Sequence, residues 1–355
     1  PDKFTNVTNG ITHRRWTMQA NPSLSNLITE LIGDGWKKNP KQLEKLVDHI
    51  GDKEVYKQLT KIKKENKERL AKYVKEHNNV ILDTNSIFDV QVKRLHEYKR
   101  QLLNALQILD LYFRIKENPD LDVKPRTFIF AAKAASAYYM AKEIIRFICT
   151  LADIINNDKD IKDKIKVVFL ENYRVSLAEI IIPAAEVSEQ ISRAGKEASG
   201  TSNMKFMING ALTLGTMDGA NVEIYEEVGE GNMFVFGLLA NQVEEMWRNG
   251  YNPTQYYNSS ERIRRLIDTL RSGLGGSTFS EIADSLTVGR GGTADGYMVL
   301  ADFESYAAAQ QRVNDTYSDK NKWNRMSLMN IAKAGFFAAD RAVEEYAKRI
   351  WGLNK

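Results

Sequence analysis

The 355-residue sequence contains one cysteine, four histidines and seven prolines. A single cysteine, Cys149, cannot form an internal disulfide, which favours a reducing, cytoplasmic compartment. The histidines are scattered and no Cys/His cluster has ligand spacing, so we expect no metal site. No apolar run is long enough to span a membrane, and the first residues lack a signal-peptide pattern. A membrane partner is therefore not expected.

The chain also has little net charge, +4 from 50 basic and 46 acidic residues. No bulk field therefore favours nucleic acid as a partner, and any anion binding must be local. No Walker loop and no Gly-x-Gly-x-x-Gly sequence follows a predicted strand, which disfavours nucleoside-triphosphate and nicotinamide chemistry. Hydrophobic residues make up 43% of the chain, which is enough to bury a core.

From about residue 85, short apolar runs alternate with helical patterns. This alternation predicts an α/β fold, a Rossmann-like parallel sheet with helices on both faces. Ligands bind beyond the carboxyl ends of such strands, so motifs directly after strands carry the most weight. The predicted strands are 87–92, 127–130, 165–170, 211–214 and 233–236, and the helices between them are 95–116, 138–155, 203–210 and 241–249.

The segments on either side of this region are predicted to be mostly helical. A short helix is expected over 22–33, and a longer amphipathic helix over 53–77, whose Lys/Glu face is predicted to be solvated. Residues 259–355 are mostly helical. The expected organisation is a lead-in over 1–84, a cofactor-binding domain over 85–320 and C-terminal helices over 321–355.

A basic segment follows the strand at 87–92 and opens a helix. Lys93, Arg94, Lys99 and Arg100 place four permanent cations near the positive end of the helix dipole, and Glu97 offsets only part of that charge. Such an arrangement becomes favourable when an anion binds there. The residues alone leave two interpretations open, an anion site and a solvated basic turn.

A second segment, Glu197-Ala-Ser-Gly-Thr-Ser-Asn-Met-Lys205, combines small residues with a lysine. The small residues allow a ligand to approach the backbone, and Thr201 or Ser202 could cap the following helix. Lys205 lies in the first turn of that helix beside apolar neighbours. Such surroundings lower the pKa of a lysine and favour Schiff-base chemistry with a carbonyl. The residues alone nevertheless favour a snorkelling surface lysine, because most lysines are of that kind.

A third segment, Glu171-Asn-Tyr-Arg-Val-Ser176, directly follows the strand at 165–170. Its polar and aromatic side chains could line a pocket or form an ordinary connecting loop. Taken by itself, the segment does not distinguish the two.

Together these segments resemble the glycogen/starch (α-1,4-glucan) phosphorylase family. The resemblance is carried by residues 197–205, by Phe88-Asp-Val-Gln-Val-Lys-Arg-Leu-His-Glu-Tyr-Lys-Arg100 and by Phe169-Leu-Glu-Asn-Tyr-Arg-Val-Ser-Leu-Ala-Glu179, and it extends from Thr5 to Gly352. It implies a transferase, the C-terminal half of a GT-B glycosyltransferase fold, with pyridoxal 5′-phosphate as cofactor. The N-terminal catalytic half of the family is expected to lie outside this chain.

The resemblance also implies roles for individual residues. Lys205 would form the Schiff base, and Lys205, Lys93, Arg94 and Lys99 would be the catalytic group. Lys93, Thr201 and Ser202 would contact the cofactor phosphate, and Trp16, Tyr173, Arg174 and Gln190 would enclose the cofactor. Arg94 and Lys99 would hold the substrate phosphate, and Asn9, Tyr98, Glu197, Ser199 and Gly200 would bind the glucosyl unit.

The implied reaction is the reversible phosphorolysis of α-1,4-glucan by inorganic phosphate to α-glucose 1-phosphate, with configuration retained. The cofactor phosphate, with a second pKa of about 6, would act as the acid/base group. The full-length protein is expected to be a homodimer, and the isolated chain to be inactive. One segment departs from the family pattern: Ala131, Ala132, Ser136 and Ala137 stand where the family usually has glycines and a proline, so added methyl groups could crowd the backbone there.

Three other functions remain open on the sequence. The chain could be a non-catalytic cofactor- or anion-binding domain, a GT-B glycosyltransferase that uses a nucleotide sugar, or a helical interaction module. The lysine-bearing segment 197–205 argues against the second, and the basic cluster is unexplained by the third.

Overall fold

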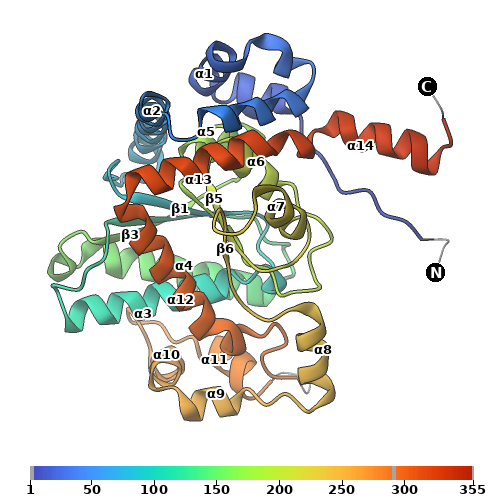
Figure 1. The fold of residues 1–355 in the computed structure, drawn as a ribbon. Helices are drawn as coiled ribbons and strands as arrows, with labels where there is room; N and C mark the ends of the chain where they lie inside the picture. The colour runs from blue at the N-terminus through green and yellow to red at the C-terminus, as the bar shows by residue number, and fades with distance from the viewer. Residues whose placement is uncertain (1–3, 290–292, 354–355) are drawn as a thin grey trace.

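The computed structural model describes residues 4–289 and 293–353. Within them, six parallel strands form one sheet in the order β3-β2-β1-β4-β5-β6 (Figure 1). The order reverses between β1 and β4, which is where a doubly wound sheet opens a crevice at its carboxyl edge. The strands are β1 (Ile87–Val92), β2 (Arg126–Ala131), β3 (Ile165–Leu170), β4 (Val187–Gln190), β5 (Leu212–Gly215) and β6 (Phe234–Val235).

The predicted parallel sheet is confirmed, but the sequence missed its fourth strand. β4 consists of Val187 followed by Ser188, Glu189 and Gln190, all of them buried. Such a strand lacks the apolar run that identifies its neighbours. Its polar side chains are tolerated because they find partners: Gln310 Nε2 donates to Glu189 Oε1 over 2.8 Å, for example.

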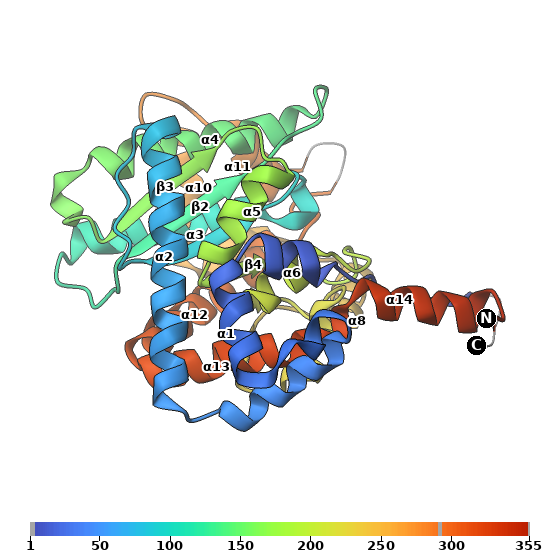
Figure 2. The same cartoon turned by 90° about the horizontal axis from the view of Figure 1, so that it is seen from above.

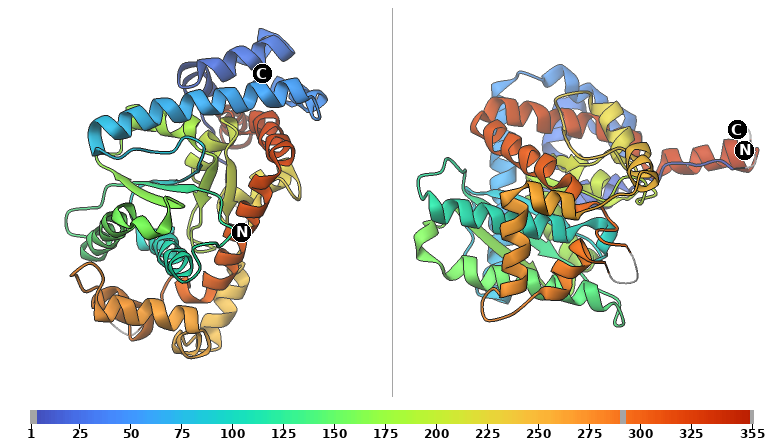
Figure 3. Two further views of the ribbon diagram at one scale, coloured as in Figure 1. Left: turned by 90° about the vertical axis from the view of Figure 1, so that its left-hand side faces the viewer. Right: turned by 90° about the horizontal axis from the view of Figure 1, so that it is seen from below.

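Helices cover both faces of the sheet and give the molecule two apolar cores (Figures 1 and 3). One face is covered by α2 (Lys53–Asn78), α5 (Val175–Ala184), α6 (Ser202–Ile208) and α13 (Lys320–Lys333), and the other by α3 (Gln101–Glu117), α4 (Tyr139–Asn157), α10 (Glu261–Ser272), α11 (Ser280–Thr287) and α12 (Val299–Ser318). The remaining α-helices are α1 (Pro22–Ile32), α7 (Asn221–Val228), α8 (Ala240–Arg248), α9 (Thr254–Ser259) and α14 (Ala339–Glu345). None of these helices is long and apolar enough to cross a membrane.

Helix α2 begins where the sequence predicts, with the Asp52 side chain accepting hydrogen bonds at its first turn. Its apolar residues Val55 and Leu59 are buried as expected. The prediction that its lysines form a solvated face was wrong for two of them. Lys67 is 3% exposed, and Lys63 also turns inward, because backbone carbonyls and a carboxylate next to the sheet hold their ammonium groups.

Helix α3 begins at Gln101, six residues later than predicted, after a 3₁₀ turn over Glu97–Lys99. Arg100, with φ +56°, turns its side chain into the core. Its guanidinium bonds Asp302 Oδ2 over 2.6 Å and the Ile191 carbonyl over 2.7 Å. The expectation of four cations facing one anion site is therefore wrong for Arg100, whose charge is already paired in the interior.

The C-terminal segment projects from the body as an arm, and the N-terminal segment lies beside it (Figure 2). The arm consists of α14 and a π-helical turn over Tyr346–Ile350, in the C-terminal segment that the sequence predicts to be mostly helical. Ile11 forms a short parallel bridge with Ala338 at the arm's base, and Arg14 pairs with Asp340. Segments more than 300 residues apart in sequence are thus joined there.

Candidate functional site

Three polar side chains meet at the carboxyl edge, where β1, β4 and α6 come together. Lys93, the residue after β1, donates from Nζ to Gln190 Oε1 over 2.7 Å. The hydroxyl of Ser202, at the start of α6, donates to the same oxygen over 3.4 Å. Gln190 is itself oriented by a 2.9 Å bond from its Nε2 to Ser188 Oγ. Sequence segments about 100 residues apart therefore converge here.

The Lys93 ammonium lies in an environment that disfavours its charge. Burial lowers the pKa of Lys93 to about 7, and the nearby charge of Lys99 acts in the same direction. The carboxylates Glu197 and Glu189 oppose that shift. An anion at this edge would favour the protonated amine, so the site is suited to binding one.

Lys99 and Tyr98 both contact Glu197, in the loop that leads to α6. Lys99 Nζ lies 2.5 Å from Glu197 Oε2, and the Tyr98 hydroxyl donates to the same oxygen over 3.4 Å. Burial opposes the charge on Lys99, but the bond to Glu197 outweighs it and raises the pKa of Lys99. These three residues, assigned by the resemblance to phosphate and glucosyl binding, are thus brought together.

Lys205 lies on α6 with its amine 4.4 Å from the centroid of the Trp16 ring. Among the described residues no hydrogen-bond acceptor contacts this amine, and burial lowers the pKa of Lys205. Asn209, at the end of α6, donates from Nδ2 to the carbonyls of Lys205 and Trp16 over 2.9 and 2.8 Å. The helix is therefore fixed against the turn over Arg14–Gln19, and the amine stays available for chemistry.

Asp218, which the sequence reasoning missed, holds the loop that precedes α6. Its carboxylate accepts from the Ser192 hydroxyl over 2.6 Å and from the backbone N–H groups of Gly195 and Glu197 over 2.8 and 2.9 Å. Three bonds to one buried carboxylate give the loop a single conformation. Asp218 follows the strand predicted at 211–214, so the rule that favours residues after strands could have found it.

Close approach of two loops explains small residues in this region. A Cβ on Gly219 would lie 2.7 Å from the Ser199 carbonyl oxygen, closer than carbon and oxygen can pack. The N–H of Ala220 donates to that oxygen over 2.8 Å. Gly200, with φ +79°, provides the left-handed residue that the neighbouring turn requires.

A further loop packs against the basic segment through Tyr138. Its hydroxyl donates to Glu97 Oε2 over 2.6 Å and accepts from the Glu97 N–H over 3.3 Å. His96 packs edge-on against the Tyr138 ring, with 5.1 Å between ring centroids. Tyr138, also missed from the sequence, therefore anchors this loop.

Of the residues that depart from the family pattern, Ala131 and Ala132 are buried, whereas Ser136 and Ala137 are exposed.

Several of the residues named from the sequence have no side-chain contact with either cluster. Arg94 is exposed, and the exposed Arg174 donates to the carbonyl of its own neighbour Asn172. Asn9 is exposed on the N-terminal segment. Tyr173 is partly buried, which raises its pKa to about 12. Thr201 takes the N-cap position of α6 without donating or accepting a capping hydrogen bond through its side chain.

No group of histidine, cysteine or acidic residues in the described parts of the chain could hold a metal ion.

A family model described as carbohydrate phosphorylase matches residues 1–353. This chain belongs to that family. Among curated relatives, this chain is 49% identical to a glycogen phosphorylase of Synechocystis, 50% to one of Bacillus subtilis and 47% to the muscle form of glycogen phosphorylase of Oryctolagus cuniculus.

All of this chain is matched in each comparison, but only 42–44% of each relative's length. The chain thus spans less than half of the curated relatives it matches. The fold observed here agrees with the expected Rossmann-like half of a GT-B phosphorylase. The activity, substrates and partners of a whole phosphorylase are considered below.

Proposed function

We propose that this chain binds pyridoxal phosphate covalently through Lys205, as the cofactor-bearing part of an α-1,4-glucan phosphorylase. The observation that carries the proposal is the Lys205 amine, which is partly buried, lies over an aromatic ring and lacks a protein acceptor among the described residues. A carbonyl compound reacts with the neutral form of an amine, which burial favours. Lys93 and Ser202, beside the first turn of the same helix, suit a phosphate group.

The phosphate of the bound cofactor would supply the acid/base group of phosphorolysis. Lys93 would hold that phosphate, with Ser202 and Thr201 at the start of α6, and Trp16, Tyr173, Arg174 and Gln190 would enclose the cofactor. Arg94 and Lys99 would hold inorganic phosphate, because two phosphates side by side require cations. Glu197, oriented through its backbone by Asp218, would contact the glucosyl unit with Asn9, Tyr98, Ser199 and Gly200.

The proposed reaction is the reversible phosphorolysis of α-1,4-glucan to α-glucose 1-phosphate, by a cytoplasmic homodimer in the full-length form. Residues 85–320 would be the cofactor-binding domain, preceded by the lead-in 1–84 and followed by helices within 321–355. Because the curated relatives are more than twice as long, we expect this chain by itself to show little turnover.

Borohydride reduction in the presence of pyridoxal phosphate, followed by peptide mapping, tests the cofactor assignment. We expect one dominant label at Lys205 and its loss in Lys205→Arg. Lys196→Arg is the matched control, because Lys196 is exposed in the same loop. Equal labelling of exposed lysines, or a label that survives Lys205→Arg, would contradict the proposal.

A second measurement tests the reaction. Glucose 1-phosphate formation from glucan and phosphate is measured for this chain alone and for a polypeptide that also carries the remainder of a phosphorylase. Turnover is expected only in the longer polypeptide. Cofactor bound at Lys205 without turnover in either form would instead support a non-catalytic cofactor-binding domain.

A further inference from the structure

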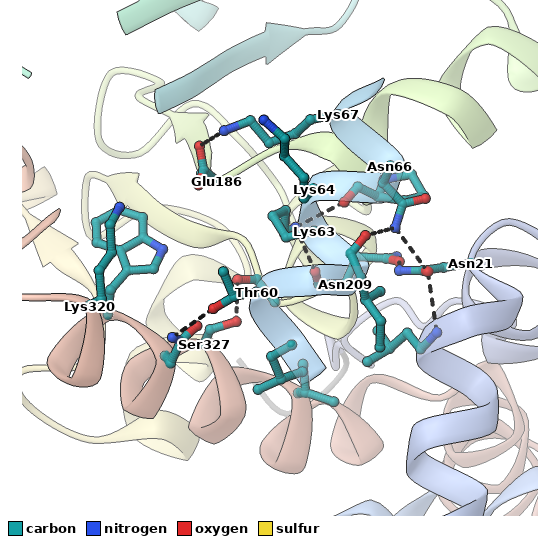
Figure 4. Close-up of a pocket in the computed structure, with 18 of the residues that line it drawn as sticks. Asn21, Thr60, Lys63, Lys64, Asn66, Lys67, Glu186, Asn209, Lys320 and Ser327 are labelled. Carbon is teal, nitrogen blue, oxygen red and sulfur yellow. Dashed lines mark hydrogen bonds and ion pairs between the residues drawn. The ribbon is translucent and has the colours of Figure 1, made fainter. Parts of the chain in front are cut away.

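A second cluster of lysines surrounds a pocket at the opposite, amino edge of the sheet (Figure 4). The pocket has a volume of about 230 Å³ and lies between α2, α13 and the segments that precede β1, β4 and β5. Lys63, Lys64, Lys67 and Lys320 line it, and Glu186 is the one carboxylate among its lining residues. Four potential cations therefore face one anion.

The two inner lysines are held by the protein itself. Lys63 Nζ donates to the carbonyls of Pro183, Ala185 and Asn209 over 2.9, 2.6 and 3.0 Å. Lys67 Nζ bonds the Ser86 carbonyl and Glu186 Oε2 over 2.6 and 2.7 Å. These bonds fix the positions of two amines in the inner wall of the pocket without using any ligand.

Three hydrogen bonds already occupy most of the acceptor positions of Glu186. Besides Lys67, its Oε2 accepts from the Phe88 N–H over 3.0 Å, and its Oε1 accepts from the Tyr317 hydroxyl over 2.6 Å. The nearby acids Asp83 and Asp319 lie outside the pocket lining and accept bonds from backbone N–H groups, in a turn and at the start of α13. The pocket therefore retains an excess of positive charge.

The two outer lysines have no carboxylate partner among the described residues. Lys64 Nζ donates to the neutral side chains of Thr84 and Asn85 over 2.6 and 2.8 Å. Lys320 Nζ lies 2.9 Å from the centroid of the Tyr317 ring and contacts no hydrogen-bond acceptor within the described chain. Lys320 as a residue is exposed, but partial burial lowers its pKa to about 8. An ammonium in this position gains most from an anionic acceptor.

One part of the remaining pocket wall is apolar and consists of Leu24, Leu59, Ile62, Trp323 and Ile331. The wall also carries polar side chains, which donate to other protein groups: those of Asn21, Thr60, Asn66, Asn324 and Ser327. We propose that this pocket binds a small organic anion with an apolar body, its charged group held by Lys64 and Lys320 and its body packed on the apolar part of the wall. An aryl sulfonate, an aryl phosphate or an aryl carboxylate combines such a charged group with an apolar body.

The pocket is connected to the helix that carries Lys205. Asn209 lines the pocket, its carbonyl is held by Lys63, and its side-chain amide donates to the Lys205 and Trp16 carbonyls. Burial lowers the pKa of Lys63 to about 7, so an anion in the pocket would favour the charged form of Lys63. The charged form donates a stronger hydrogen bond to the Asn209 carbonyl. A ligand here therefore stabilises the end of α6 without touching the Lys205 amine.

Isothermal titration calorimetry with benzenesulfonate tests the site, using the whole chain without pyridoxal phosphate. We expect saturable binding that Lys320→Met and Lys64→Met each weaken about tenfold, the value of one charge-assisted hydrogen bond. Lys61→Met is the matched control, because Lys61 is an exposed lysine of α2 outside this pocket. Circular dichroism of each variant checks that the fold is retained.

Three outcomes would overturn the proposal: no saturable binding, equal weakening by Lys61→Met, or weakening by Arg94→Met but not by Lys320→Met. The last would place the probe at the carboxyl-edge site. Inorganic sulfate and benzyl alcohol, which carry the charge or the apolar body alone, should each bind at least about tenfold more weakly than benzenesulfonate. Equal binding of either would contradict the amphipathic pocket. Because no cofactor is involved, the result is independent of the proposed reaction.

The pH dependence provides a further check. Benzenesulfonate keeps its charge between about pH 6 and about pH 9, whereas Lys63 and Lys320 lose protons in this range. The affinity should fall as the pH rises. The other titratable groups that line the pocket are Lys64, Lys67, Glu186 and Tyr317. Glu186 is hydrogen-bonded to Lys67 and Tyr317, and burial raises the pKa of Tyr317. Affinity that is constant over this range would contradict the assignment.

Discussion

The two edges of the sheet each hold a partly buried lysine whose pKa is lowered to about 7, yet the two lysines differ in their surroundings. At the carboxyl edge, Lys93 donates to one side-chain oxygen, that of Gln190, and has two other cations nearby in the sequence. At the amino edge, Lys63 donates to three backbone carbonyls. A lowered pKa therefore does not by itself identify a functional amine. The number of protein acceptors distinguishes an amine that can bind a ligand from one that holds the fold.

Helix α6 joins the two edges. It begins at Ser202, next to Lys93 and Gln190, and its C-cap Asn209 is bonded by Lys63. A seven-residue helix has little stability of its own. Its position, and so the position of Lys205, depends on contacts at both ends.

The largest expected effect follows from removing the amine at the amino edge. Lys63→Met would leave three enclosed carbonyl oxygens without their donor, so we expect the free energy of unfolding to fall by about 3 kcal/mol in urea denaturation. Lys93→Met removes one such bond and should cost about 1 kcal/mol. Equal losses of unfolding free energy in the two variants would contradict the proposed difference between Lys63 and Lys93.

The next effect concerns the loop at the carboxyl edge. Asp218→Ala would remove three hydrogen bonds and is expected to lower the free energy of unfolding by about 2 kcal/mol and to slow cofactor labelling of Lys205. Asp268→Ala, at an exposed carboxylate that accepts from Tyr257, is the control. Unchanged labelling would show that the loop needs no anchoring by Asp218.

The pH dependence of anion binding separates the two lysines with the same pKa. Sulfate keeps its charge across neutral pH, whereas Lys93 attracts it only while the amine is protonated. The affinity for sulfate should therefore be greatest below about pH 7 and fall by up to about tenfold per pH unit above it. Lys93→Met should remove most of that dependence. If Lys63→Met removes it instead, the sulfate binds at the amino edge.

The smallest effect on stability is expected at Arg94. This residue is exposed, so Arg94→Met should change the free energy of unfolding by less than about 0.5 kcal/mol. Phosphate binding at the carboxyl edge should nevertheless weaken several-fold, because one cation is lost. Calorimetry with inorganic phosphate measures the difference, and a large loss of stability would show that Arg94 serves the fold.

Much of the fold could be predicted from local sequence because the sheet is buried on both faces. The strands at 87–92 and 165–170 were located to the residue, since continuous β-branched and aromatic runs have few alternatives in an α/β chain. The strand over 187–190 could not be predicted, because three of its four residues are polar and only their tertiary partners make burial acceptable.

The candidate site was predicted only in part. The order of residues placed Lys93 and Lys99 after a predicted strand. Glu197 follows β4, which the sequence missed, and the tertiary structure brings it into contact with Lys99. Asp218 and Tyr138 were missed because their roles consist of bonds to loops distant in sequence. Arg100 was misjudged because Asp302, its buried partner, lies 202 residues away.

By itself, the sequence determined the chemistry available to this protein: a parallel sheet, cations after its first strand and a lysine after a small-residue loop. These three features depend on residue type and on the order of residues along the chain, because hydrophobic patterning and the backbone freedom of small residues act over only a few residues. Only the tertiary structure decided which cations are paired inside the protein and stabilise the fold. That choice depends on whether a distant carboxylate or carbonyl reaches each ammonium or guanidinium group, as for Lys63, Lys67 and Arg100.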